Sequence, residues 1–339
     1  MNNGQAPAML ITAFMLAAAF VLLLTPIAII TAKKLGIVDH PNSSLKRHKQ
    51  PTPYLGGLSI LMAIILTLII HLTLFVPSIN AEHAGLLLGL LLIVSLGLFD
   101  DMYGISPLTK LAFQCLATVI VWTQGLEFFI HQNALINGIF FFIWMIGISN
   151  AFNLVDIMDG LASGIGGIAA FFIALLMFSK GELFYGLLLC ALAGACLGFL
   201  VFNFKPAKIF LGDAGSLAIG FLLASAAVKW SDVSEGNEVY APLLVLGIPI
   251  FETIYISLLR MKAGKSPLLG SNDHFAKRMV KMGFSIKQTV IFTYGFGLLL
   301  GIAALAGTFY SASMIYSITA AIVVFASIGF MLSKVDIHS

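Results

Sequence analysis

The sequence predicts an all-α, polytopic membrane protein, and two observations lead to this prediction. Of its 339 residues, 60% are hydrophobic and only 10% are charged, and the mean hydropathy is +1.03. A soluble domain needs a polar surface that this composition cannot supply. Apolar stretches long enough to cross about 30 Å of hydrocarbon also recur along the whole chain. We therefore expect one integral membrane domain over residues 1–339.

Eleven apolar stretches are predicted as membrane helices, because a segment inside the bilayer must satisfy its backbone hydrogen bonds internally. In chain order they cover approximately residues 8–32, 54–77, 84–99, 108–124, 133–152, 161–178, 183–202, 214–229, 239–259, 289–309 and 313–332. The segment MNNGQAPAM lacks the basic residues of a signal peptide, so we expect the first stretch to remain as an anchor. The three cysteines lie in apolar stretches without a CxxC pair, which predicts core packing.

The basic residues lie almost entirely in alternate loops, and this bias predicts the orientation of the chain. Counted from the N-terminus, the odd-numbered loops and the C-terminus hold sixteen of the eighteen, whereas the other loops hold only Lys180 and Lys229. Because cytoplasmic loops carry the excess of Lys and Arg, we expect the N-terminus outside and the C-terminus in the cytoplasm. The net charge of +3 is too small to suggest nucleic acid as a partner.

The acidic residues divide into two groups on the same topology. Those of the outer loops come with no motif, which predicts solvated surface; they are Glu82, Glu127, Glu182, Asp232, Glu235 and Glu238. Those of the cytoplasmic side each lie at or beside a predicted helix end, among Gly, Asn, Pro and basic residues; they are Asp39, Asp100, Asp101, Asp156, Asp159, Asp213 and Asp273. We therefore expect an active site on the cytoplasmic face.

The stretch SLGLFDDMYG places two adjacent aspartates, Asp100 and Asp101, at the end of the third predicted helix. A carboxylate at mid-membrane costs about 2.5 to 3.5 kcal/mol, and less near the interface. If no other polar segment were present, the pair would be explained as two solvated acids at the membrane interface, with Lys110 as counter-charge. The other polar segments favour a shared chemical role.

Two further segments add polar residues to the same side. In SNAFNLVDIMDGLASG, four residues follow at steps of three, which on a helix brings them toward one face; they are Asn150, Asn153, Asp156 and Asp159. Helix capping would explain one or two of them but not four. In FNFKPAKIFLGDAGSLAIGF, a Gly-rich turn around Asp213 opens a helix. Such a turn offers backbone N–H groups to an anion, and its Asp offers oxygen to a hard cation.

The two longest basic loops supply cations. The ninth, RMKAGKSPLLGSNDHFAKRMVKMGFSIKQ, holds seven Lys and Arg residues with Asp273 and His274, and the first, VDHPNSSLKRHKQPTPYLGG, adds further ones. The simpler explanation of these basic residues is that they keep both loops in the cytoplasm. We also take Lys46, His48 and Arg278 as candidates for substrate binding. Acids for Mg²⁺ and cations for phosphates together predict phosphoryl transfer.

The motifs HKQPTPYLGG, GLFDDMYGISPLTKLAFQ, NAFNLVDIMDGLA and AKIFLGDAGSLAIGF, with the histidine-bearing ninth loop, resemble those of the polyprenyl-phosphate N-acetylhexosamine-1-phosphate transferases. The phospho-MurNAc-pentapeptide translocases belong to the same superfamily. The resemblance implies exchange of the UMP of a UDP-sugar for a polyprenyl (undecaprenyl) phosphate, an early membrane step of cell-envelope glycan synthesis. It also implies Mg²⁺, with Mn²⁺ as a substitute, and a bacterial multi-pass protein of the inner or plasma membrane. A homodimer is left open.

The resemblance assigns roles residue by residue. Catalytic roles are implied for Asp100, Asp101, Asp213 and His274. Ligation of Mg²⁺ is implied for Asp213, Asn153 and Asp100. Contacts to phosphate or nucleotide are implied for Lys110, Asn150, Asn153, Asp156 and Asp159.

This sequence also departs from the family pattern. The motif Asp156-Ile157-Met158-Asp159-Gly160 lacks the family's first glycine, and the ninth loop keeps one histidine, which is a weak argument against a peptide-bearing muramyl substrate. Two other classes of function fit the sequence less well. An ion-coupled transporter would use acids inside the helices, and only Glu252 fits that pattern. A non-catalytic scaffold would leave the cytoplasmic motifs without a purpose.

Overall fold

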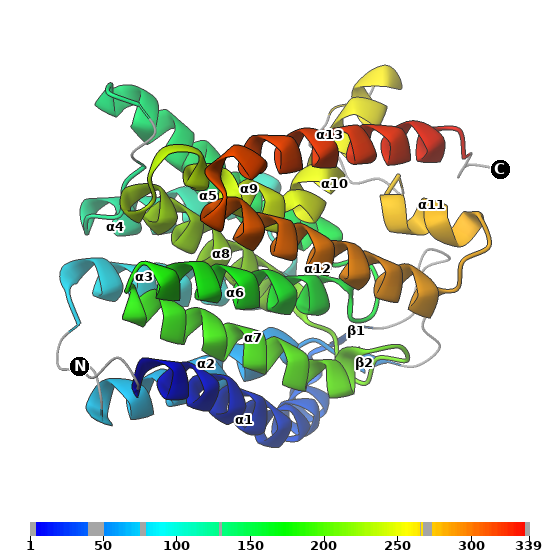
Figure 1. The fold of residues 1–339 in the computed structure, drawn as a ribbon. Helices are drawn as coiled ribbons and strands as arrows, with labels where there is room; N and C mark the ends of the chain where they lie inside the picture. The colour runs from blue at the N-terminus through cyan, green and yellow to red at the C-terminus, as the bar shows by residue number, and fades with distance from the viewer. Residues whose placement is uncertain are drawn as a thin grey trace. The chain divides into compact units, whose positions relative to one another are not determined.

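The computed structural model describes residues 5–39, 51–74, 79–128, 131–264, 266 and 273–335, and these are almost entirely helical (Figure 1). The longer helices are α1 Gln5–Leu35, α2 Gly56–Leu74, α3 Ala81–Tyr103, α4 Pro107–Thr123, α5 Ala134–Val155, α6 Leu161–Ser179, α7 Leu183–Asn203, α8 Gly212–Val233, α10 Gly247–Lys262, α12 Ile286–Phe309 and α13 Ser311–Ser333. The short elements are β1 Val38–Asp39, β2 Thr52–Pro53, η1 Gly236–Tyr240, α9 Ala241–Val245 and α11 Phe275–Lys281. The all-α prediction is confirmed.

Nine of the described helices are long and apolar enough to cross a membrane, or up to ten if the pair Gly236–Val245 and Gly247–Lys262, bent by 69°, is one span. The fourth expected stretch, 108–124, forms α4, which is apolar but shorter. Large apolar side chains point outward, as on α1, where Ile11, Met15 and Leu23 are each more than half exposed. In water such faces would be unfavourable, whereas lipid solvates them. The protein is a multi-pass membrane protein.

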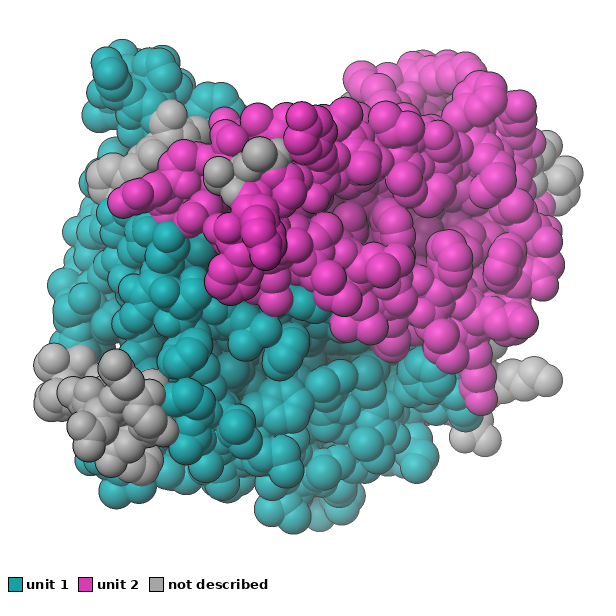
Figure 2. All heavy atoms as spheres, viewed as in Figure 1, with its two compact units in different colours: residues 1–233 teal, residues 234–339 magenta. Residues whose placement is uncertain are grey.

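The chain forms two compact units, residues 1–233 and 234–339, coloured separately in Figure 2. In the first unit α1 packs on α2 and α7, and α6 packs on α7. The second unit contains α12 against α13 and α9, with α10 against α13.

Helix α8 lies at the centre of the first unit, in contact with α2, α3, α5, α6 and α7. Within its most apolar stretch of 18 residues, 94% are buried. Small residues allow this packing because they let helix backbones approach closely. A Cβ at Gly97 of α3 would overlap the backbone of Ala214, so the end of α3 lies directly against the start of α8.

The segment before α8 is held by backbone and amide hydrogen bonds. The N–H groups of Gly56 and Gly57 donate to the carbonyls of Phe210 and Leu211 at 3.1 and 2.8 Å. From the other side, the Asn203 side chain donates to the Ile209 carbonyl at 3.0 Å. Because both sides of the segment are bonded, the position of Asp213 at the start of α8 is determined by the fold.

The prediction that Glu82 is solvated surface was wrong. Its carboxylate accepts the Tyr185 hydroxyl at 2.8 Å and lies 3.4 Å from the Lys229 ammonium, with its side chain only 14% exposed. Lys229 also pairs with Asp232 at 2.9 Å. These contacts join the starts of α3 and α7 to the end of α8. The sequence pattern missed the contacts of Glu82 because its partners, Tyr185 and Lys229, are more than a hundred residues away.

Candidate active site

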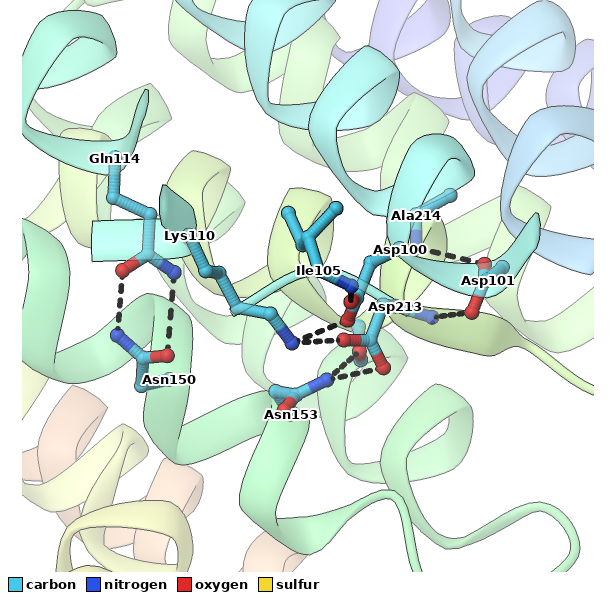
Figure 3. Close-up of polar contacts among 10 residues, drawn as sticks. Asp100, Asp101, Ile105, Lys110, Gln114, Asn150, Asn153, Asp213 and Ala214 are labelled. Atoms are coloured by element: carbon cyan, nitrogen blue, oxygen red, sulfur yellow. Dashed lines mark hydrogen bonds and ion pairs between the residues drawn. The ribbon is translucent and has the colours of Figure 1, made fainter. Parts of the chain in front are cut away.

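Asp100 and Asp101 lie in the last turn of α3 and point toward different partners (Figure 3). Asp100 Oδ1 accepts the Ile105 N–H at 2.8 Å, and Asp100 Oδ2 lies 2.5 Å from the Lys110 ammonium. Helix α3 ends directly after this pair, with Gly104 at φ 64° as its C-cap. Ser106 then caps α4 by accepting the Thr109 N–H, so the chain turns back and brings Lys110 to Asp100.

Asp101 binds the first turn of α8. Its carboxylate oxygens accept the N–H groups of Asp213 at 2.9 Å and Ala214 at 3.3 Å. The side chain thus acts as an N-cap supplied from another helix, and its negative charge complements the positive end of the α8 dipole. Gly212 has φ +72°, and a Cβ there would lie 2.5 Å from Asp101 Oδ2, which is why glycine is needed.

The expected anion site in the GDAGS turn requires a correction. Two N–H groups that the sequence analysis offered to a phosphate are already used by Asp101. Helix N-termini do bind anions through such groups, but here the anion is a carboxylate of the protein itself. The turn therefore positions the Asp213 side chain, and the N–H groups of Asp213 and Ala214 are not open to substrate.

Asp213 is the residue on which the site converges. Its Oδ2 lies 2.5 Å from the Lys110 ammonium, and its Oδ1 accepts the Asn153 side-chain amide at 2.8 Å. Asn153 also donates to Ser216 at 3.1 Å. Thus α3, α4, α5 and α8 each contribute a polar side chain to one point (Figure 3). The side chains of Asp100, Lys110 and Asp213 are 14%, 19% and 26% exposed, so the cluster can be reached from outside.

The predicted four-residue polar face on one helix was wrong, because α5 ends at Val155. Only Asn150 and Asn153 lie on α5. Asn150 lies three residues before Asn153 on α5. It pairs with Gln114 of α4 through two amide hydrogen bonds of 2.9 and 3.2 Å. Asn150 therefore joins α4 to α5, and its side-chain amide is already hydrogen-bonded.

Asp156 and Asp159 lie in the turn between α5 and α6. Asp159 accepts the Ala207 N–H at 3.0 Å and pairs with Lys205 at 3.2 Å, so it holds the segment that leads to α8. Asp156 makes no side-chain hydrogen bond or ion pair within the described residues. Its burial raises the pKa of the carboxyl well above its usual range, and the nearby charges of Asp213, Asp101 and Asp159 raise it further.

The remaining predicted residues lie elsewhere. Lys46 and His48 fall outside the described residues. His274 and Arg278 belong to the second unit, and both are buried, with 5% of each residue exposed. Arg278 donates to the carbonyls of Leu332 and Val335 at the end of α13 and to Asp273. This geometry gives Arg278 an anchoring role, and its contact with substrate stays a prediction.

The charge of the cluster bears on the predicted Mg²⁺. Asp100 and Asp213 share the single ammonium of Lys110, so carboxylates outnumber the cation at this point. The described residues contain no group of three His, Cys, Asp or Glu side chains placed to hold an ion by themselves. Mg²⁺ in phosphoryl-transfer sites takes one or two carboxylates and completes its shell with water and phosphate. Asp100 and Asp213 fit such a partial shell.

Sequence reasoning missed the residues that support the site. The Gln114 side chain pairs with Asn150, and the Ser216 hydroxyl accepts a hydrogen bond from the Asn153 amide. The Asn203 amide donates to the Ile209 carbonyl in the loop before α8. Gln114 had a detectable signal, because it lies four residues after Lys110 and so on the same helical face. Ser216 and Asn203 lie in apolar surroundings and gave no such signal.

The fold and this site together define a helical membrane protein whose polar centre gathers two acids, a lysine and an asparagine from the ends of four helices. The family model for glycosyl transferase family 4 matches residues 83–231, the part that holds all of these side chains. The chain belongs to this family.

Relatives match over most of the chain. It is 32% identical over 291 residues to the undecaprenyl-phosphate alpha-N-acetylglucosaminyl 1-phosphate transferase of Thermotoga maritima, covering 85% of this chain and 87% of that one. It is 32% identical to the decaprenyl-phosphate N-acetylglucosaminephosphotransferase of Mycolicibacterium smegmatis, covering 78% and 74%. It is 34% identical to the phospho-N-acetylmuramoyl-pentapeptide-transferase of Streptococcus pneumoniae, covering 66% and 73%.

Asp156 and Asp159 are predicted to affect stability in opposite directions. Since the folded state raises the pKa of Asp156, the ionised carboxylate destabilises the fold at neutral pH. Asp156→Asn should therefore raise the melting temperature in detergent at neutral pH, by about 1–3 °C. This gain should shrink toward about pH 4, where the carboxyl of the unfolded chain is protonated as well.

Asp159→Asn is the matched control in the same turn. It weakens the bonds to Ala207 and Lys205 and should lower the melting temperature. A lower melting temperature for Asp156→Asn at neutral pH, or a gain that does not change with pH, would contradict the interpretation of Asp156.

Proposed function

We propose that this protein transfers an N-acetylhexosamine 1-phosphate from a UDP-sugar to polyprenyl phosphate, with N-acetylglucosamine as the first candidate sugar. The observation that carries the proposal is the bridge in which Lys110 lies 2.5 Å from both Asp100 and Asp213. It combines a phosphate-binding cation with two oxygen ligands for Mg²⁺ at the ends of membrane helices. The names of the Thermotoga and Mycolicibacterium relatives support the lipid phosphate and the sugar.

The reaction is a phosphoryl transfer without a strong base. An oxygen of the lipid phosphate attacks the phosphorus that adjoins the sugar. The bond from that phosphorus to the bridging oxygen breaks, and its electron pair leaves with UMP. A phosphate monoester has a second pKa of about 6, so the attacking group is already largely dianionic at neutral pH. The work of the protein is therefore positioning and charge stabilisation.

The residues of the first unit divide this work. The Lys110 ammonium has three N–H donors, of which Asp100 and Asp213 take two. The third can bind a phosphate oxygen. The side-chain N–H of Asn153 donates to Asp213, and the side-chain oxygen of Asn153 is left for a ligand. Asp156, which has no partner of its own among the described side chains, is the candidate for the nucleotide.

Asp100, Asp213 and Asn153 would hold Mg²⁺, with Mn²⁺ as a substitute. A bound divalent cation would neutralise the charge that develops on the pyrophosphate. The excess of carboxylates over lysine supports this proposal. The same residues orient the two phosphates so that the attacking and leaving oxygens can lie in line.

The proposal includes the orientation in the membrane. We place the site on the cytoplasmic face of a bacterial inner or plasma membrane, with eleven spans, the N-terminus outside and the C-terminus inside. The distribution of sixteen basic residues against two supports this orientation. UDP-sugars made in the cytoplasm would then reach the site directly.

The alternatives have less support. Transfer of a phospho-MurNAc-pentapeptide is favoured by the Streptococcus relative, which matches a smaller share of the chain. A transporter would need Glu252 as an acid of an ion path. Instead, Glu252 is bonded to His274 at 2.8 Å inside the second unit.

The direct test is release of UMP by the purified protein with polyprenyl phosphate, Mg²⁺ and a panel of UDP-sugars. We expect turnover with UDP-N-acetylglucosamine and much less with UDP-MurNAc-pentapeptide. Asp213→Asn and Asp100→Asn should each lower kcat by at least about a hundredfold, because the phosphates lose a charged organiser. No UMP with any sugar, or near-normal rates in both variants, would refute the proposal. Glu235→Gln, at an exposed position, is the control.

The orientation is tested by cysteine labelling in a variant without native cysteines. Glu235→Cys and Lys281→Cys are both exposed and lie on opposite sides in the proposed topology. A membrane-impermeant thiol reagent applied to intact spheroplasts should label the first and not the second. Both should be labelled after the membrane is opened. Labelling only at position 281 would invert the orientation.

A further inference from the structure

The second unit has a groove between α10 and α13. The two helices touch near Gly247, where a Cβ would lie 3.1 Å from the Phe325 ring, and near Gly329, where it would lie 3.4 Å from the rings of Phe251 and Tyr255. Beside these contacts they leave a groove of about 660 Å³, which α9 also lines. Sites for small molecules in proteins are about 300–1,000 Å³. The groove is therefore large enough to hold a ligand.

The lining of the groove is almost entirely apolar. Its inner surface includes stacked aromatic rings, with Phe251 centred 5.4 Å from Tyr255 and 4.8 Å from Phe325. At its rim Leu258 and Phe330 are 57% and 67% exposed. Helix α13 is long and apolar enough to cross a membrane, and only 6% of its most apolar stretch is buried. A hydrocarbon chain is the favourable occupant, because water would lie against apolar surface and an empty groove would lose van der Waals contacts.

One end of the groove is positively charged. Lys262, in the last turn of α10, is the one charged residue among the described residues that line the groove, and it is exposed. Lys334 follows α13, and its ammonium lies 4.3 Å from the centre of the Phe330 ring. Gly247 lies beside Phe325 and Tyr255 beside Gly329, so the two helices run in the same direction along the groove. Both lysines therefore lie toward the same end.

We propose that this groove binds an anionic phospholipid of the membrane, with an acyl chain between α10 and α13 and the phosphate at Lys262. Basic pockets between membrane helices bind acidic head groups in this way. The Lys262 ammonium has three N–H donors for phosphate oxygens. A ligand that binds the folded state stabilises it, so the lipid should stabilise the second unit.

The charges favour an anionic phospholipid over two other lipids. In phosphatidylcholine the choline cation offsets the phosphate within the same head group, whereas phosphatidylglycerol keeps its negative charge for the protein. The polyprenyl phosphate of the proposed reaction must bring its phosphate to Lys110, whereas a phosphate bound at Lys262 belongs to a resident lipid. This site goes beyond the proposed function and does not rest on it.

The first test is lipid retention by the full-length protein. Delipidated protein in detergent would receive equal amounts of phosphatidylglycerol and chain-deuterated phosphatidylcholine, and native mass spectrometry would count the lipid that stays bound. We expect one retained phosphatidylglycerol. Lys262→Gln should lower the preference for phosphatidylglycerol by about fivefold. Lys287→Gln, at an exposed position of α12 outside the groove, should leave it unchanged. Equal retention of both lipids by the wild type, or equal loss in both variants, would overturn the proposal.

The second test fills the groove. Ala326 is an exposed residue of α13 that lines the groove, so Ala326→Trp should occupy it without disturbing the core. Ala320→Trp places the same ring at an exposed position of α13 outside the groove. Added phosphatidylglycerol should raise the melting temperature of the wild type and of Ala320→Trp by about 2–4 °C, and should not raise that of Ala326→Trp. An equal rise in all three proteins would place the lipid elsewhere and overturn the proposal.

The third test asks whether another molecule occupies the groove. For a resident phospholipid, the KM for polyprenyl phosphate in Ala326→Trp should stay within about twofold of that in Ala320→Trp. A large rise in this KM with phosphatidylglycerol retention unchanged would assign the groove to the lipid substrate. Loss of a dimer in Ala326→Trp with retention unchanged would assign it to a second copy of the chain. Either result would overturn the proposal. Lipid retention does not depend on turnover, so if no UMP is released while retention follows these variants, the proposed function fails and the lipid site stands.

Discussion

The bond between Asp101 and the first turn of α8 is the interaction on which the site depends. Helix α8 is the buried centre of the first unit, and the N–H groups of Asp213 and Ala214 in its first turn need partners away from water. Asp101 supplies them from the end of α3, at a point where Gly97 and Gly212 leave no room for side chains. The start of α8, and with it Asp213, is thereby located relative to α3.

Asp100 and Asp101 are adjacent in sequence but have different partners, because their side chains point in different directions. Asp101 is turned toward the α8 backbone, whereas Asp100 is turned toward Lys110 and shares that ammonium with Asp213. The charge of Asp101 complements the α8 helix dipole, whereas Asp100 and Asp213 hold the Lys110 ammonium between them. In the second unit Glu252 resembles Asp101 in one respect, since it too caps a helix from another one.

The sequence predicted the helices and the side chains of the cluster, because membrane hydropathy and motif spacing are local properties. It did not predict which groups bond to which. Asn150 and Asn153 share one helix yet bind different partners, Gln114 and Asp213, since those come from α4 and α8. The early end of α5 was also missed, because a step of three residues looks the same in a helix and in the turn that follows it. Glu82 was misjudged for the same reason, as it is bonded to residues remote in sequence.

Hydrogen–deuterium exchange in detergent tests the central claim most directly, in peptides that contain residues 213–216. Asp101→Ala should speed exchange of the Asp213 and Ala214 amides, by about tenfold for each 1.4 kcal/mol of lost protection. Asp100→Ala should leave these amides near their wild-type rates, because Asp100 does not bind them. Unchanged exchange in Asp101→Ala, or an equal increase in both variants, would contradict the account.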